Sequence, residues 1–159
     1  RDRIIPVIRA NAPEAVILVG TPNYCTDFTG PSKQPLKYDN IMYTMHRYID
    51  VTEEKPCENV LLESVVAQGI PVFVSEWGTS AEEEAVLKSG EYDNEAVIYQ
   101  ENAKPFIDYM KEHRISWTAW ALGNKEEAHS MIRSSCDKYS GWTSNDLTDF
   151  GRLIFSNFK

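Results

Sequence analysis

Four short apolar runs alternate along the chain with segments in which apolar residues recur every three or four positions. The runs are typical of buried strands in a parallel sheet, and the recurring spacing is typical of amphipathic helices. Such alternation indicates an α/β fold with crossover helices. The predicted strands cover residues 15–19, 41–48, 70–74 and 115–120, and the predicted helices cover residues 2–10, 59–68, 94–114 and 148–158.

Two predicted helices carry further signals. Pro105 lies inside the segment 94–114, so either that helix kinks there or a second helix begins. Thr148 is a plausible N-cap for the last helix, whose apolar stripe comprises Phe150, Leu153, Ile154 and Phe158. The chain between residues 23 and 39 reads as a polar loop, and the acidic run 82–84 as a solvated loop or a first helical turn.

The strand predicted at 70–74 ends in Ser-Glu-Trp-Gly, residues 75–78. A carboxylate at the carboxyl end of a buried strand lies where α/β proteins build their sites. The alternative is that Glu76 caps or pairs with something structural. Because a buried charge is costly unless it has a partner, we favour a functional role for Glu76.

Composition narrows the possible partners. The 159 residues are 42% hydrophobic, which fits one globular domain covering residues 1–159. The formal net charge of −8 disfavours binding to nucleic acid or to an anionic membrane surface and suits a neutral substrate. No apolar run approaches the roughly eighteen residues of a membrane span. The chain starts at Arg1 with neither an initiator Met nor a visible signal peptide, so we expect that an upstream part has been removed.

The cysteines give little support to a metal site. Cys25, Cys57 and Cys136 are an odd number without a Cys-x-x-Cys spacing, and no pair of histidines accompanies them. A disulfide between Cys25 and Cys57 is one alternative, and free, partly buried thiols are the default. We expect no metal and no cofactor.

Four stretches together resemble the carboxyl-terminal half of a glycoside hydrolase family 5 enzyme, of the bacterial and rumen endoglucanase kind. They are Val-Gly-Thr-Pro-Asn-Tyr at 19–24, Ile-Met-Tyr-Thr-Met-His-Arg-Tyr at 41–48, Val-Phe-Val-Ser-Glu-Trp-Gly at 72–78, and Ser-Trp-Thr-Ala-Trp at 116–120 followed by Lys125 and Glu127. The resemblance covers nearly the whole chain. It implies strands 5–8, with their helices, of a (β/α)8 TIM barrel.

The resemblance also implies a reaction. Members of the family hydrolyse β-1,4-glucans such as cellulose with retention of configuration, which requires two carboxyl groups about 5–5.5 Å apart. Glu76 matches the catalytic nucleophile at the end of the seventh strand. The family's acid/base Glu lies in an Asn-Glu-Pro motif on the fourth strand, and these 159 residues contain no such motif. The chain is therefore expected to carry half of a catalytic pair.

The remaining matches concern substrate binding. His46 and Tyr48 match a His-x-Tyr motif on the sixth strand, in which the His lines a sugar subsite and the Tyr hydroxyl binds the nucleophile and helps hold it ionised. The alternative for His46 is a satisfied core histidine. Tyr24 stands where relatives usually carry a Trp that stacks a glucose on the leaving-group side; otherwise it is an ordinary loop aromatic.

Two further matches lie on and after the predicted last strand. Trp120 matches a platform that stacks a sugar face, whereas Trp117 is expected in the core. Lys125 and Glu127 match a pair that hydrogen-bonds the distal glycone sugar, and a solvated charge pair is the alternative.

Three functions follow from these expectations. The leading one is half of a secreted endo-β-1,4-glucanase that forms a glycosyl-enzyme intermediate on Glu76. The second is a non-catalytic half-barrel that binds carbohydrate, and the third is a half-barrel that assembles with a second copy of this chain or with an amino-terminal half. Relatives acting on mannan or xylan share the framework, so the polysaccharide is left open between these glycans.

Overall fold

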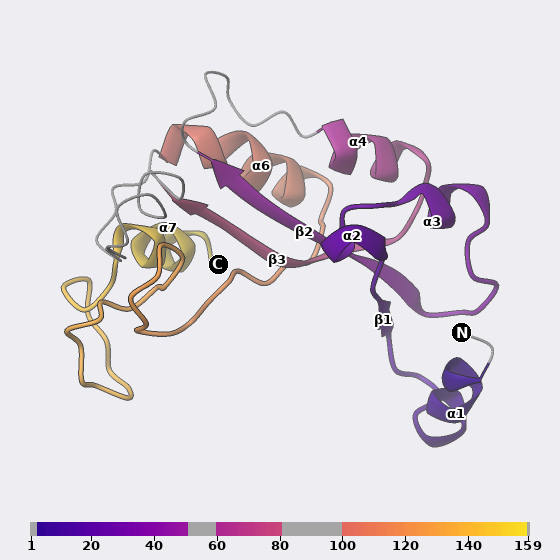
Figure 1. Cartoon of the computed structure of the whole chain (residues 1–159), viewed down its shortest axis with the longest axis horizontal. Coiled ribbons are helices and arrows are strands. Elements are labelled where there is room, and N and C mark those ends of the chain that lie inside the picture. The colour runs from indigo at the N-terminus through magenta and orange to yellow at the C-terminus, as the bar shows by residue number, and fades with distance from the viewer. Residues whose placement is uncertain (1–2, 51–59, 81–99, 159) are drawn as a thin grey trace. The chain divides into compact units, whose positions relative to one another are not determined.

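The described chain alternates helices with the strands of one sheet, as the computed structural model of residues 3–50, 60–80 and 100–158 shows. In chain order the elements are α1 (Ile4–Asn11), β1 (Ile17–Val19), α2 (Pro22–Cys25), α3 (Thr29–Lys33), β2 (Ile41–Asp50), α4 (Val60–Ala67), β3 (Val72–Ser80), α6 (Gln100–Glu112) and α7 (Asp149–Asn157) (Figure 1). The sheet has the order β1-β2-β3, with β1 parallel to β2 and Ile17 opposite Ile41. The predicted α/β class is confirmed, while the acidic run 82–84 and residues 94–99 lie outside the described residues.

The chain divides into two compact units. The first comprises Arg1–Met45 and Leu61–Phe73, and the second comprises His46–Val60 and Val74–Lys159. β2 and β3 each begin in the first unit and end in the second. Within the described ranges, no helix has the length and apolar character needed to cross a membrane.

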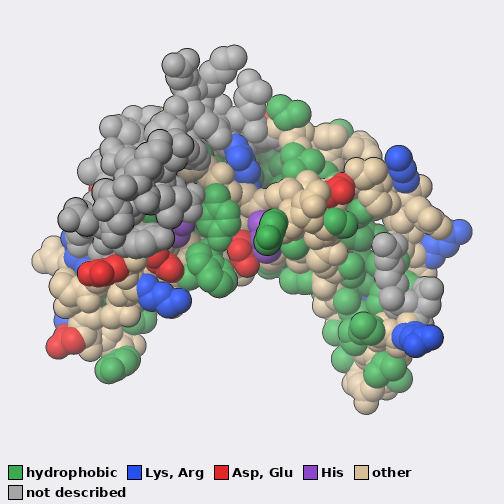
Figure 2. All heavy atoms as spheres, in the orientation of Figure 1, with side chains coloured by type: hydrophobic (Ala, Val, Ile, Leu, Met, Phe, Trp, Pro, Cys, Tyr) green, Lys and Arg blue, Asp and Glu red, His purple; other side chains and the backbone are tan. Residues whose placement is uncertain are grey.

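The first unit keeps several apolar side chains at its surface. Helix α1 buries only Ile5, while Ile4 and Val7 are exposed, and Leu18 of the three-residue strand β1 is exposed as well. Hydrophobic side chains are visible at the surface on the face drawn in Figure 2. Arg9 ties the end of α1 to the chain on both sides of β1, since its guanidinium donates to the carbonyls of Ala15 and Asp39, each at 2.6 Å.

The segment predicted as a loop, residues 23–39, is in part helical. It contains most of α2 and all of α3, two short helices of four and five residues. Pro22 begins α2, a position where its fixed φ and missing N–H cost nothing. Asn23 and Tyr24 have positive φ values of 52° and 53°, so α2 is not a regular right-handed helix. Elements this short leave no periodic hydrophobic pattern, which is why the sequence reads as a loop.

Trp77 is the centre of the second unit. Its side chain is fully buried, and its ring meets those of Phe106, Trp117 and Phe150 edge to face, with centroids 5.7, 5.5 and 6.0 Å away. Phe106 belongs to α6 and Phe150 to α7, so both helices pack against β3. The buried residues of α6 follow the helical spacing i, i+3, i+4, i+7; they are Ala103, Phe106, Ile107 and Met110. Pro105 lies inside this single helix.

Helix α7 starts as the sequence predicts. The Thr148 hydroxyl accepts a hydrogen bond from the Gly151 N–H at 3.0 Å and donates to the Ser130 carbonyl at 2.7 Å. A Cβ on Gly151 would lie 2.0 Å from the Met131 carbonyl oxygen, so this turn sits directly on the preceding segment. Phe158 is not part of the buried stripe as predicted: it follows the end of α7 and is largely exposed, although its ring contacts Trp117.

The prediction of a regular fourth strand at residues 115–120 is wrong. The segment forms one parallel bridge to β3, in which the Val74 N–H donates to Ser116 and the Val74 carbonyl accepts from Thr118. The next bond runs from the Trp120 N–H to the Trp77 carbonyl. Two residues of the segment thus match three residues of β3, and the extra residue interrupts the ladder as a bulge does.

The same bonds place Glu76 differently from the prediction. Strand β3 continues through Ser80, so Glu76 lies within the strand and not beyond its end. The irregular pairing between Val74 and Trp77 includes Glu76, and such irregularities often re-aim a side chain near a site.

Candidate functional site

The Glu76 carboxylate is met by two side chains of the neighbouring strand. The Tyr48 hydroxyl donates to Glu76 Oε2 at 3.1 Å, and His46 Nδ1 lies 3.5 Å from the same oxygen. His46 and Tyr48 are two residues apart on β2, so the alternation of a strand puts both on one face. The side chains of His46 and Glu76 are 23% and 29% exposed, which leaves the carboxylate accessible from outside. The structure therefore brings together three of the predicted site residues.

His129 is a neighbour of this group that the sequence did not indicate. Its buried imidazole lies 4.9 Å from the Tyr48 ring, centroid to centroid, at a tilt of 56°, and it meets the Phe150 ring edge to face. Burial lowers the pKa of His129, and the negative charge of Glu127 opposes this shift. His129 lies on a segment without helical or strand periodicity. No motif or periodic spacing in the sequence marks it.

The lowered pKa of His129 makes the stability of the fold depend on pH. The ordinary pKa of a histidine side chain is about 6.5, and below that pH the unfolded chain binds a proton more readily than the folded chain does. The contribution of His129 to the free energy of unfolding should therefore be fully present above about pH 6.5 and be lost as the pH drops toward the folded-state pKa. Urea unfolding at about pH 7.5 and about pH 5 should show a smaller pH-dependent loss for His129→Phe than for the wild type. Equal losses would exclude His129 as the source.

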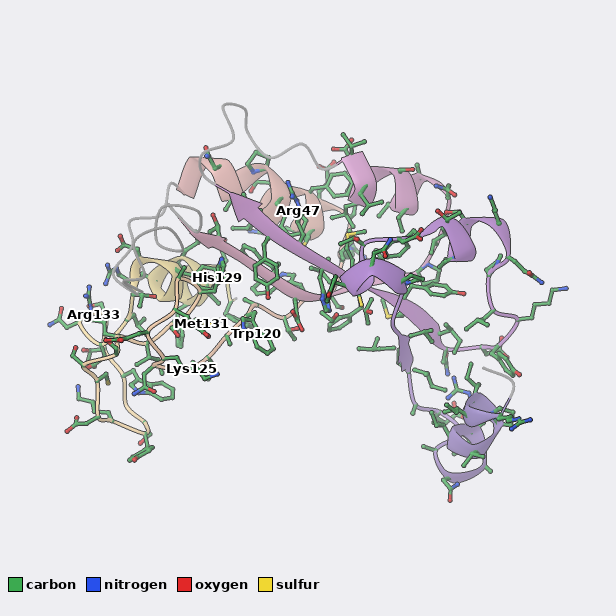
Figure 3. The ribbon with its side chains drawn as sticks, in the orientation of Figure 1. Arg47, Trp120, Lys125, His129, Met131 and Arg133 are labelled. Atoms are coloured by element: carbon green, nitrogen blue, oxygen red, sulfur yellow. The ribbon has the colours of Figure 1, made fainter. Side chains whose placement is uncertain are left out.

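The other predicted sugar contacts follow α6 on one segment, along which Figure 3 labels Trp120, Lys125 and His129. Trp120 is 45% exposed, and a cis peptide bond joins it to Ala121. Lys125 is exposed, whereas Glu127 is half-buried and close enough to influence His129. An exposed indole held at its backbone by Trp77 is suited to stacking on a ligand. Trp117 is half-buried, not in the core as predicted, and its ring packs against those of Trp77 and Phe158.

Tyr24 belongs to the first unit, whereas Glu76 belongs to the second. The Tyr24 side chain is 92% exposed, and its backbone is in the left-handed region. The prediction that it contacts a sugar on the leaving-group side stays a prediction.

The cysteines that the structure describes are free thiols, in agreement with the default expectation. Cys25 Sγ accepts a hydrogen bond from the Thr44 hydroxyl at 3.0 Å, and Cys136 is buried. Cys57, the other member of the alternative disulfide, lies outside the described residues. In residues 3–50, 60–80 and 100–158, no three His, Cys, Asp or Glu side chains converge as a metal site requires.

Comparison with known families agrees with this arrangement. The profile of the family described as Cellulase (glycosyl hydrolase family 5) matches residues 1–126, which include Glu76, His46 and Tyr48. The chain belongs to glycosyl hydrolase family 5. The family assignment confirms the resemblance carried by the four sequence stretches.

Two curated relatives of the family 5 chain are endoglucanases. An endoglucanase of Clostridium saccharobutylicum is 36% identical over 151 residues, covering 95% of this chain and 31% of the relative. Endoglucanase A of Butyrivibrio fibrisolvens is 38% identical over 149 residues, covering 93% of this chain and 32% of the relative. The chain thus spans about a third of the length of these relatives.

Solved structures give the fold of the family 5 chain. The catalytic domain of an endoglucanase from Thermobifida fusca matches with a TM-score of 0.75 and 26% identity, covering 96% of this chain and 48% of that domain. A second structure of that catalytic domain, a variant in complex with cellotetraose, matches with a TM-score of 0.76 at 24% identity. The neighbours imply a (β/α)8 barrel, of which the structure of this chain is a part.

Proposed function

We propose that the chain is the carboxyl-terminal half, strands 5–8, of the catalytic barrel of a retaining endo-β-1,4-glucanase. The observation that carries the proposal is the contact of Tyr48 and His46 with one carboxylate oxygen of Glu76, in a member of a cellulase family. The hydroxyl that donates to Oε2 orients the carboxylate. A nucleophile has to be held facing the carbon that it attacks.

The proposed reaction is a double displacement in two steps. First, Glu76 attacks the anomeric carbon, the bond from that carbon to the leaving oxygen breaks, and an acid on the amino-terminal half protonates that oxygen. The acid residue, now a carboxylate, then takes a proton from water as the water oxygen attacks the anomeric carbon and the ester bond to Glu76 breaks. In the described part of the chain the contacts of Glu76 fall on Oε2, which leaves Oε1 free to attack.

The proposed substrate is a β-1,4-glucan such as cellulose. The support is the endoglucanase relatives and the cellotetraose complex of the Thermobifida fusca neighbour. Trp120, as an exposed indole, would stack on a sugar face, and Lys125 with Glu127 would bind hydroxyl groups of the distal glycone sugar. Tyr24 would contact the sugar on the leaving-group side. Because such a polymer is degraded outside the cell, we also propose that the enzyme is secreted.

The proposed partner is an amino-terminal half-barrel. A chain that covers 48% of a solved catalytic domain leaves room for about as many residues again. The exposed Ile4, Val7 and Leu18 are apolar surface that further strands and helices would cover. A second copy of this chain is the alternative partner. It would supply a second Glu76 but no Asn-Glu-Pro motif.

The test is to recover the upstream coding sequence and assay its full-length product. We expect four more βα units with an Asn-Glu-Pro motif, and reducing sugar released from carboxymethylcellulose faster than from mannan or xylan. Faster release from mannan or xylan would overturn the assigned substrate. Binding to cellulose without hydrolysis would overturn the proposed enzymatic function and favour a carbohydrate-binding module.

A further inference from the structure

Gly78, two residues after Glu76, lies against the imidazole ring of His129. A Cβ placed on Gly78 would be 2.6 Å from His129 Cδ2, 3.1 Å from Cγ and 3.3 Å from Nε2. The first distance is shorter than van der Waals contact allows, so an alanine at this position would push the ring away. Gly78 does not have a positive φ, so backbone conformation does not require a glycine here. The close approach of the His129 ring does, because it leaves no room for a side chain.

Three groups from three different elements surround the imidazole of His129. Gly78 of β3 lies against the ring, the Tyr48 ring of β2 is 4.9 Å away, and the Phe150 ring of α7 is 6.1 Å away, centroid to centroid. The backbone is held too, because the Ala121 N–H donates to the His129 carbonyl at 2.8 Å. Aromatic rings in contact at this distance restrict each other's orientation. The position of His129 is therefore coupled to that of Tyr48.

We propose that His129 is a positioning residue for Glu76, acting through Tyr48: its ring, seated on the bare backbone of Gly78, fixes the Tyr48 ring whose hydroxyl donates to Glu76 Oε2. The inference rests on the proposed function, because it assigns His129 a role in the same reaction. It also explains why the last residue of Ser-Glu-Trp-Gly is a glycine: a side chain on Gly78 would displace the His129 ring. Burial lowers the pKa of His129, so the ring that supports Tyr48 is uncharged near neutral pH.

The first test compares two substitutions at His129 in the full-length enzyme. His129→Ala removes the ring and should lower kcat on cellooligosaccharides about 10- to 100-fold with KM nearly unchanged, since small misplacements of reacting groups are costly. His129→Phe keeps a flat ring and should recover most of kcat. His113→Ala is the matched control: His113 also contacts a tyrosine, Tyr109 at 4.1 Å, but lies exposed just after α6 and should leave kcat unchanged.

The second test asks whether His129 acts through Tyr48. Tyr48→Phe removes the hydroxyl that donates to Glu76, so adding His129→Ala to it should cost less than about twofold further in kcat. Gly78→Ala should lower kcat in the wild-type background and have little further effect after His129→Ala, because the clash has gone. Multiplicative losses in either double variant would overturn the proposal.

A structural readout separates this inference from the proposed function. Crystal structures of the full-length His129→Ala and His129→Phe variants should show the Tyr48 hydroxyl beyond hydrogen-bond distance of Glu76 in the first and within it in the second. If the wild-type enzyme releases no sugar, the proposed function fails and this distance alone decides the inference. An unchanged Tyr48–Glu76 hydrogen bond in His129→Ala would overturn the positioning role.

Discussion

Replacing Glu76 by Gln in the full-length enzyme should lower kcat by about three orders of magnitude or more while cellooligosaccharide binding is retained. The amide has almost the shape of the carboxylate, and its oxygen can still accept the hydrogen bond that Tyr48 donates to Glu76. It lacks the negative charge needed to form the ester with the sugar. The loss should therefore appear in turnover and not in binding, measured by initial rates and by calorimetric titration with cellotetraose.

Two controls make the Glu76 prediction specific. Glu63→Gln on α4 and Glu112→Gln at the end of α6 change the same groups at exposed positions and should leave kcat within about twofold of the wild type. A 2-fluoro cellobioside with an activated leaving group should label the wild-type enzyme on the peptide that contains Glu76. Near-normal turnover of Glu76→Gln, or a label on another carboxylate, would end the assignment.

The 159-residue chain alone should release no sugar from carboxymethylcellulose, although it carries Glu76. Departure of the leaving group requires a positioned acid, and general acid catalysis is typically worth about 10²–10⁴-fold. Glu76 cannot supply that proton, because it must be ionised when it attacks. Glu127 is the nearest other candidate on the segment that follows α6, but the resemblance assigns it to the distal glycone sugar, away from the bond that is cleaved. In the proposed half-barrel, half of the cleft would also be absent, so a bound glucan would lose contacts.

The experiment compares this chain with the same chain carrying Glu76→Gln, by reducing-sugar release. We expect both to stay at the blank. Activity should appear when a separately produced amino-terminal half with its Asn-Glu-Pro motif is added, provided that the halves dock. Turnover by the wild-type chain above the Glu76→Gln blank would mean that a second carboxylate in these residues does the work of the acid, and the half-site account would be wrong.

The residues around Glu76 could be predicted because their positions follow from local rules. A strand places every second residue on one face, so His46 and Tyr48 had to share a face once 41–48 was recognised as a strand. The apolar run before Glu76 indicated the neighbouring strand. The motifs then supplied what periodicity lacks, namely which carboxylate the two side chains face.

The rest depends on contacts between distant parts of the chain. His129 reaches Tyr48 through a segment that is held by isolated backbone hydrogen bonds, such as the one from the Ala121 N–H to the His129 carbonyl, and no periodic pattern in the sequence records these. The ladder of residues 115–120 is interrupted by an extra residue on β3, an irregularity that strand propensity does not show. The short helix α2 depends on left-handed backbone at Asn23 and Tyr24, which few side chains favour.

The placement of the tryptophans determines what intrinsic fluorescence can report on this protein. All four tryptophans, at 77, 117, 120 and 142, lie in the unit that carries Glu76. Fluorescence excited selectively at tryptophan therefore does not report on unfolding of the first unit. Within the second unit, buried Trp77 should emit at short wavelength and resist acrylamide, whereas exposed Trp120 should be quenched. The short-wavelength emission should therefore report unfolding of the aromatic core around Trp77, and acrylamide quenching should report changes around Trp120. Unfolding of the first unit has to be followed by its tyrosines or by circular dichroism.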